Sequence, residues 1–294
     1  MYKYIDPFTD FGFKYVFGTE KSKPYLMDFI NTLLDGEPGF DTVTDVRFID
    51  KEKNRIYKES RGVIYDILCI TEDGRQFIVE MQNGSQAYFI DRSIFYMSRA
   101  LFDQGCHGDW DFRLSPVFII AFLNFKIDSL GDQLRTDALL CNMNTRQPLS
   151  DKMRFIYIQL LLFGEKDPDN CSSGFDQWIY ILKNMKTMET MPFVDKRPLF
   201  RDFAQHVEYA SLSPKERETY ERDLKAHRDL VNQMRYATEK SKAEGKAEGK
   251  AEGKAEEKAY AIRTMHGFGI STAQIAEKYN TTVDEIQKIL ETEN

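Results

Sequence analysis

The sequence has little of what marks secreted, membrane-spanning or zinc-binding proteins. Its longest apolar run, Val117–Leu123, is far shorter than the ~20 residues that a membrane-spanning helix needs. Its four cysteines are widely spaced and form no Cys-x-x-Cys pair, which argues against a disulfide framework or a zinc site. The first residues contain no apolar stretch of the kind that signal peptides carry. These absences predict a reduced, cytoplasmic protein without a membrane partner.

Several enzyme classes also lack their patterns here. The four histidines show no metal-ligand spacing, and no glycine-rich loop follows a predicted strand, so P-loop and dinucleotide-binding folds are not indicated. The chain has 40 Lys and Arg residues against 47 Asp and Glu, a net charge of −7, which excludes a globally basic nucleic-acid binder. A local basic groove stays open, because electrostatic steering depends on where the charges lie.

The chain has enough apolar material for a real core, with 42% hydrophobic residues over 294 positions. Periodicity and β-branched content predict elements in the order helix, strand, two-stranded hairpin, helix, strand, which is a mixed α/β pattern. The predicted strands cover residues 42–49, 61–70, 76–82, 117–123 and 153–163. The predicted helices cover residues 24–34, the segment from Gly84 to Gly105, 178–185, 199–209 and 214–236.

The C-terminal third has a different composition. From Ala243 the chain repeats Ala-Glu-Gly-Lys, in which each glycine costs a helix about 0.8–1.0 kcal/mol relative to alanine. The repeat predicts a solvated linker or weak helical stalk, and an oligomerising helix is the alternative. Two later segments that begin at Ser271 and Thr282 resemble capping boxes, each before a short amphipathic helix. The second helix carries acidic residues where a DNA-reading helix would approach bases, so a cap or a protein contact is as well supported.

These shifts in composition predict four parts. They are a core domain over 1–165, a helical extension over 166–238, the low-complexity linker or stalk over 239–258, and a short helix-turn-helix-like segment over 259–294.

The predicted hairpin around Gly74 carries two acidic residues, Asp66 and Glu80, that could form a functional site. A three-residue loop with Gly74 in the left-handed conformation places Asp66 directly opposite Glu80. Gln82 then projects from the same face as Glu80. A two-residue loop would shift the register by one and move Asp66 to the other face, so the chemistry depends on the loop length.

Two carboxylates that meet among apolar neighbours repel each other unless a cation lies between them. Oxygen ligands of this kind suit Mg²⁺ or Mn²⁺, and the carbonyl of Met81 can add a ligand. A cation held by Asp66 and Glu80 could polarise a phosphate. The alternative is that both acids lie on the exposed face of an ordinary hairpin.

A set of residues around this pair resembles the PD-(D/E)XK nuclease superfamily, and in finer detail the Rpn family of recombination-promoting nucleases and transposases. The resemblance extends over residues 1–290 and is concentrated in residues 61–125. The matching features are Asp10, Phe13 and Phe17 at the start, Asp66 in Asp-Ile-x-Cys, the Glu80-Met-Gln82 segment, Arg92 and Tyr96 on the next helix, and Pro116 before the apolar strand.

The resemblance implies a restriction-endonuclease-like core, with a central mixed sheet flanked by helices and a helical C-terminal extension. It implies a Mg²⁺- or Mn²⁺-dependent DNA endonuclease of recombination or transposition, with Asp66 and Glu80 as metal ligands. Gln82 stands where the superfamily usually has lysine, so it can orient a water but brings no charge. Lys14, Arg61 and Arg92 are the predicted DNA contacts.

Two points stay open at this stage. Because Gln82 replaces a lysine, a weak or inactive nuclease-like scaffold that acts in DNA binding or protein assembly is the alternative function. A homodimer is compatible with the resemblance, although the sequence contains no recognisable interface.

Overall fold

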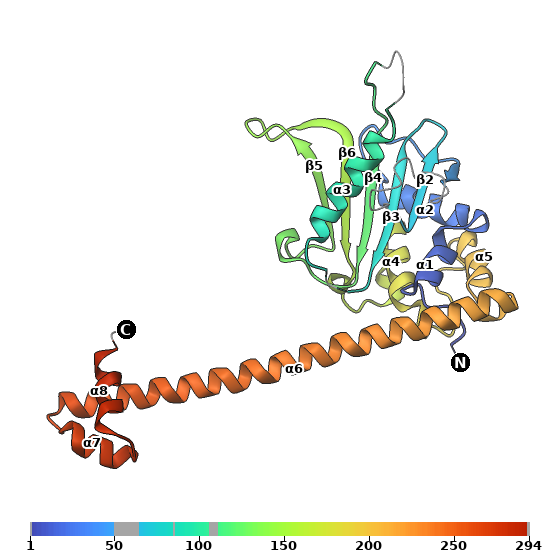
Figure 1. The fold of residues 1–294 in the computed structure, drawn as a ribbon. Helices are drawn as coiled ribbons and strands as arrows, with labels where there is room; N and C mark the ends of the chain where they lie inside the picture. Colours follow the sequence, from blue (N-terminus) through green and yellow to red (C-terminus); the bar gives the residue numbers. More distant parts are fainter. Residues whose placement is uncertain (1, 50–64, 85, 106–110, 293–294) are drawn as a thin grey trace, which may run out of the picture. The chain divides into compact units, whose positions relative to one another are not determined.

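The structure of the chain, a computed structural model, describes residues 2–49, 65–84, 86–105 and 111–292 (Figure 1). The chain divides into two compact units, Met1–Asp229 and Leu230–Asn294. No helix among the described residues is both long and apolar enough to cross a membrane.

The first unit is built on one mixed six-stranded sheet with the strand order β1-β2-β3-β4-β6-β5. The β3–β4 and β4–β6 pairs are parallel, and the other neighbouring pairs are antiparallel. The strands are β1 (Val46–Phe48), β2 (Ile67–Thr71), β3 (Gln76–Gln82), β4 (Val117–Leu123), β5 (Arg135–Cys141) and β6 (Pro148–Gln159).

Helices cover both faces of this sheet, which confirms the predicted mixed α/β fold with flanking helices and a helical C-terminal region (Figure 1). Side chains alternate between two cores along β3. Phe77, Val79 and Met81 belong to the larger core, which also contains the apolar faces of α1, α2, α4 and α5. Ile78 belongs to the smaller core under α3. The helices are α1 (Asp10–Phe17), α2 (Lys23–Leu33), α3 (Phe89–Phe102), α4 (Gly174–Asn184), α5 (Pro198–His206) and α6 (Pro214–Gly267).

Local signals explain where these helices begin. The Thr9 hydroxyl caps α1 by accepting a hydrogen bond from the Gly12 amide, and Ser173 caps α4 in the same way. A proline lies in the first turn of both α2 and α5, where its missing N–H costs nothing.

The β2–β3 hairpin has the predicted three-residue loop. The Thr71 amide donates to the Arg75 carbonyl at 2.9 Å, and Gly74 adopts a left-handed φ of 85°. Ile67 consequently pairs with Val79, which is the register of the three-residue alternative and the one that brings Asp66 toward Glu80.

Replacing Gly74 with alanine should lower the free energy of unfolding by about 2 kcal/mol, because a Cβ atom in this conformation is strained. That Cβ would also lie 2.9 Å from the Ser115 hydroxyl oxygen. Gly36 is the matched control, since it has a similar φ of 74° but no atom within 4 Å of the position that a Cβ would take. We expect Gly36→Ala to cost about 1 kcal/mol in urea unfolding. If both variants lose the same free energy of unfolding, then the close approach of Ser115 adds nothing to the cost at Gly74.

The secondary structure differs from the prediction at several places. The β6 strand begins at Pro148, earlier than predicted, and residues 160–163 of the predicted strand form a 3-10 turn. The β5 strand was absent from the prediction, as was helix α1. The predicted strand over 42–49 shortens to β1. Residues 61–64 of another predicted strand lie outside the described residues.

The second unit is helical. It contains the last part of α6, α7 (Thr272–Tyr279) and α8 (Val283–Glu291), which bury a small core of Ile262, Ile275 and Ile286. Ser271 forms the predicted capping box, and Thr282 caps α8 through the Glu285 amide. The Ala-Glu-Gly-Lys repeat lies within α6, so its alanine, glutamate and lysine residues outweigh the glycine cost and favour a helical stalk over an extended linker.

Candidate metal centre and active site

Asp66 and Glu80 meet at the end of the β2–β3 ladder. The Asp66 amide donates to Glu80 Oε1 at 3.0 Å, and the Met81 amide donates to Asp66 Oδ2 at 3.0 Å. Each carboxylate therefore binds the backbone of the opposite segment, just beyond the last ladder pair, Ile67 with Val79. Each of these two bonds uses one of the two oxygens of its carboxylate. The arrangement fixes both acids at one place on the hairpin.

Burial separates this pair from an ordinary surface hairpin. Glu80 is only 3% exposed, on the face of β3 that α3 covers, and Gln82 on the same face is 9% exposed. The alternative of two solvated acids on an exposed face is therefore wrong for Glu80. A buried carboxylate is costly unless hydrogen bonds or a cation stabilise it.

Arg92 on α3 brings a positive charge to the pair. Its Nη2 lies 3.9 Å from Glu80 Oε2, and its Nη1 donates to the Gln86 side chain. Its guanidinium also lies over the rings of Phe89 and Tyr96, 5.1 and 5.5 Å from their centroids. The buried Arg92 Nε has no hydrogen-bond partner in the part of the chain that the structure describes. The Arg92 side chain is 30% exposed, so the accessible part of the guanidinium can meet a further acceptor, such as a phosphate oxygen.

Two tyrosines form the apolar wall beside the acids. The Tyr65 and Tyr96 rings meet edge to face at 5.2 Å between centroids. Burial raises the pKa of Tyr96, and the Glu80 and Asp66 carboxylates raise it further, against the opposing effect of Arg92. Burial raises the pKa of Tyr65 in the same way, and the Asp103 carboxylate contributes. A tyrosine is protonated at neutral pH even without such shifts, and the raised pKa values hold these two protons more firmly.

The backbone of Met81 also faces the pair. Within a strand, the N–H and C=O of one residue point to the same edge. Because the Met81 amide reaches Asp66, the Met81 carbonyl points to the same edge. Gln82 follows it, with its own carbonyl accepting from the Asn124 amide at 2.9 Å.

The structure does not place the other two predicted DNA contacts, Lys14 and Arg61, beside the acid pair. Lys14 lies on α1, whose apolar side packs on the opposite face of the sheet, and its ammonium is ion-paired with Asp10. Arg61 lies outside the described residues.

The donor set fits a hard divalent cation. Among the described residues, no group of three or more His, Cys, Asp or Glu side chains could hold a metal. The pair could offer two carboxylates to such a cation, and the Met81 carbonyl, which points to the same edge, could add a third oxygen. Mg²⁺ keeps several waters and binds through one or two carboxylates, so a fuller protein cage is unnecessary.

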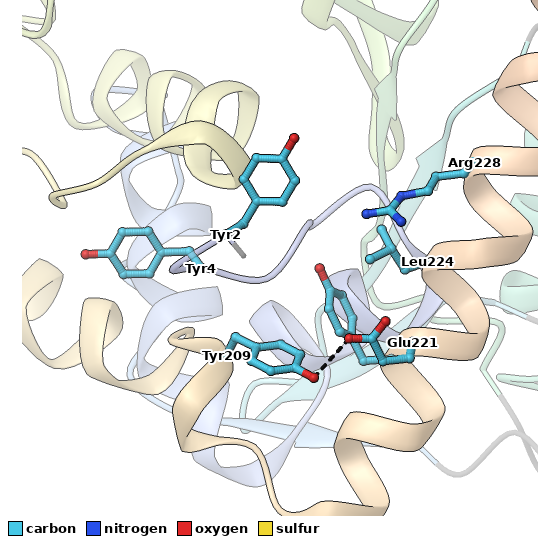
Figure 2. A pocket seen from close by; sticks show the side chains of 7 residues that line it. Tyr2, Tyr4, Tyr209, Glu221, Leu224 and Arg228 are labelled. Atoms are coloured by element: carbon cyan, nitrogen blue, oxygen red, sulfur yellow. Dashed lines mark hydrogen bonds between the residues drawn. The ribbon is translucent and has the colours of Figure 1, made fainter.

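A separate hollow lies at the start of α6 (Figure 2). It has a volume of about 570 Å³, and the Tyr209 hydroxyl donates to Glu221 across it at 2.9 Å. Neither acid of the pair lines it. The lining residues are Tyr2, Tyr4, Tyr209, Tyr220, Glu221, Leu224 and Arg228.

Asp66, Glu80 and Arg92 were predicted from the sequence as site residues, whereas the contact of Gln86 with Arg92 was not. Gln86 sits in a loop without periodicity, so only the folded geometry reveals that it holds the Arg92 guanidinium.

Comparison with known proteins gives one match. No curated protein and no solved structure matches the chain significantly. A family model described as PD-(D/E)XK nuclease family transposase matches residues 7–237, a range that includes the acid pair, Gln82 and Arg92. This match covers most of the chain and confirms the resemblance that the sequence motifs indicate. The chain therefore belongs to the PD-(D/E)XK nuclease family of transposases, a family of nucleases related to transposition.

Proposed function

We propose that the protein is a metal-dependent DNA endonuclease that hydrolyses phosphodiester bonds during recombination or transposition. One observation carries the proposal: Asp66 and Glu80 bind each other's backbone segments and so converge at one strand end, beside Arg92. Family membership supports it, because nucleases of this kind generally use divalent metals.

Each side chain of the site has a proposed role. Asp66, Glu80 and the Met81 carbonyl would hold Mg²⁺ or Mn²⁺, which when bound supplies Lewis acidity toward a phosphate oxygen. Arg92 binds a non-bridging phosphate oxygen and positions the phosphate next to the acids. The Gln82 side chain orients the attacking water by accepting a hydrogen bond from it. The burial of Glu80 strengthens these interactions, since charges attract more strongly away from bulk water.

Gln82 also supports the rival function. Because an amide cannot neutralise developing charge, the site lacks the cation that lysine would supply at this position. A scaffold that binds DNA without cutting it, or that acts in protein assembly, is the second candidate.

The test is nicking of supercoiled plasmid by the purified full chain. We expect nicked circles with about 5 mM Mg²⁺ or Mn²⁺, a concentration suited to a weak carboxylate site. We expect none after chelation, with activity restored when excess metal is added back. DNA binding that persists without any metal-dependent nicking would reject the enzyme and favour the scaffold.

Three further expectations accompany this proposal. Lys14 and Arg61 stay predicted DNA contacts. Homodimerisation and a cytoplasmic location stay predictions as well.

A further inference from the structure

The outward side of α3 carries large aromatic side chains at seven-residue intervals. Tyr88, at the N-cap, is 80% exposed, Phe95 is 58% exposed and Phe102 is 64% exposed. Arg92 and Arg99 alternate with them at four- and three-residue steps, a spacing that keeps residues on one side of a helix. We call these five residues the α3 stripe. Large apolar side chains that gather on one exposed face mark an interaction site.

The stripe runs to the acid pair. Arg92 lies 3.9 Å from Glu80, so a ligand that contacts this arginine is next to the proposed metal ligands. Arg99 is held by Asp103, with Nε 2.9 Å from Oδ2, and lies over the Phe102 ring at 5.8 Å. Arg92 lies over the Phe89 and Tyr96 rings, so both guanidinium groups are held in place while staying partly exposed.

Tyr88 is held in an unusual backbone conformation. Its φ of 64° and ψ of 27° are left-handed values that an aromatic residue seldom adopts. Strain of this kind costs about 1–3 kcal/mol and is concentrated at functional sites. The ring gains no burial in return, since it is the most exposed aromatic of the stripe.

The pattern does not suit a second helix. A helix–helix seam needs apolar side chains at both heptad positions, three or four residues apart. Starting from the aromatic positions, the second heptad position is occupied by Asp91 and Ser98, both polar. The residues four positions after Tyr88 and Phe95 are arginines. Rings interleaved with arginines instead match a nucleic-acid strand, which offers base faces for stacking and phosphates for guanidinium groups.

We propose that the α3 stripe binds an unpaired DNA strand and leads it to the acid pair, so that the substrate is DNA with a single-stranded region. Aromatic rings gain affinity by stacking on base faces, and a duplex hides those faces in its interior. Arg92 then holds the phosphate that reaches Glu80. The inference rests on the proposed nuclease function for its second step, whereas strand binding by the stripe is independent of cleavage.

The experiment measures binding of the full chain to a fluorescent single-stranded oligonucleotide and to the matching duplex, without added metal. We expect tighter binding to the single strand. The Tyr88→Ala, Phe95→Ala, Phe102→Ala triple variant should lose about tenfold or more of that affinity, because each base stacked on a ring contributes substantially. The variant Tyr88→Phe, Phe95→Tyr, Phe102→Tyr keeps the rings and should keep the affinity.

The control is Tyr236→Ala, which removes an aromatic ring of 70% exposure from another helix and should leave the affinity unchanged. Equal affinity for single strand and duplex, or an unchanged triple variant, would overturn the inference. A loss of self-association in the triple variant, measured by sedimentation, would overturn it too, because the stripe would then bind a second copy. Cleavage of the single-stranded oligonucleotide with Mg²⁺ or Mn²⁺ separates the two proposals: a wild-type chain that binds the single strand but cleaves neither it nor the plasmid rejects only the nuclease.

Discussion

The Asp66→Asn, Glu80→Gln double variant is expected to nick plasmid at least about a thousandfold more slowly than the wild-type chain. Loss of a Lewis acid removes several kcal/mol of transition-state stabilisation, and each ~1.4 kcal/mol changes a rate tenfold. Neutral amides bind Mg²⁺ far less well than carboxylates do, so both proposed ligands lose their charge in this variant. Initial nicking rates at saturating metal measure the effect.

The substitutions are chosen to leave the fold intact. Asparagine and glutamine keep an acceptor oxygen, so the bonds from the Met81 and Asp66 amides can persist. Glu72→Gln is the matched control, because it removes the same charge from an exposed position in the loop of the same hairpin. If the double variant nicks plasmid at the wild-type rate, or if Glu72→Gln loses as much activity as the double variant, then Asp66 and Glu80 are not the metal ligands.

The second large effect concerns stability. Trp178→Ala should lower the free energy of unfolding by about 4 kcal/mol, since truncation of a buried tryptophan costs about 3–5 kcal/mol. Trp178 is fully buried in the larger core, where its ring packs against Phe17, Phe200 and Phe203. Its Nε1 also donates to Asp28 Oδ2 at 2.7 Å. Urea unfolding followed by circular dichroism measures the loss.

Two variants bracket this result. Trp178→Phe keeps an aromatic ring but loses the bond to Asp28, which Arg197 continues to hold, so a smaller loss of about 1–2 kcal/mol is expected. Phe102→Ala removes an exposed ring and should change stability by no more than about 0.5 kcal/mol. A Trp178→Ala loss as small as that of Phe102→Ala would contradict the place of Trp178 in the larger core.

The central part of the sheet follows directly from the sequence. The predicted bounds of β3 and β4 agree with the structure, because β4 is a continuous apolar run and β3 is rich in β-branched and aromatic residues between turn residues. Gly74 limited the hairpin to two loop lengths, and the structure adopts the three-residue loop that brings Asp66 to Glu80.

Other elements depend on contacts that no local pattern contains. The β5 strand is mostly exposed and does not alternate, and its place is determined by pairing with β6. A cluster of charges also stabilises it, in which Arg135 and Arg154 share Asp137 and Glu37. Partners that lie far apart along the chain cannot be deduced from one sequence.

The candidate site likewise combines features that the sequence predicts with features that depend on the fold. The acid pair was predicted from the hairpin register and Arg92 from the family resemblance, whereas the contact of Arg92 with Gln86 and the side-chain bonds to the Met81 and Asp66 amides needed the fold. The α3 stripe had a signal in the sequence, namely aromatic residues seven apart. That signal becomes interpretable only when the exposed side of α3 is known.

Binding of Mn²⁺ tests the central claim most directly, because it needs neither DNA nor turnover. In a titration followed by electron paramagnetic resonance, the full wild-type chain should bind Mn²⁺ at a site that Mg²⁺ competes for. The Asp66→Asn, Glu80→Gln variant should lose that site, and Glu72→Gln should keep it. Mn²⁺ binding of equal strength in the wild-type chain and the double variant would contradict the proposal that Asp66 and Glu80 hold the metal.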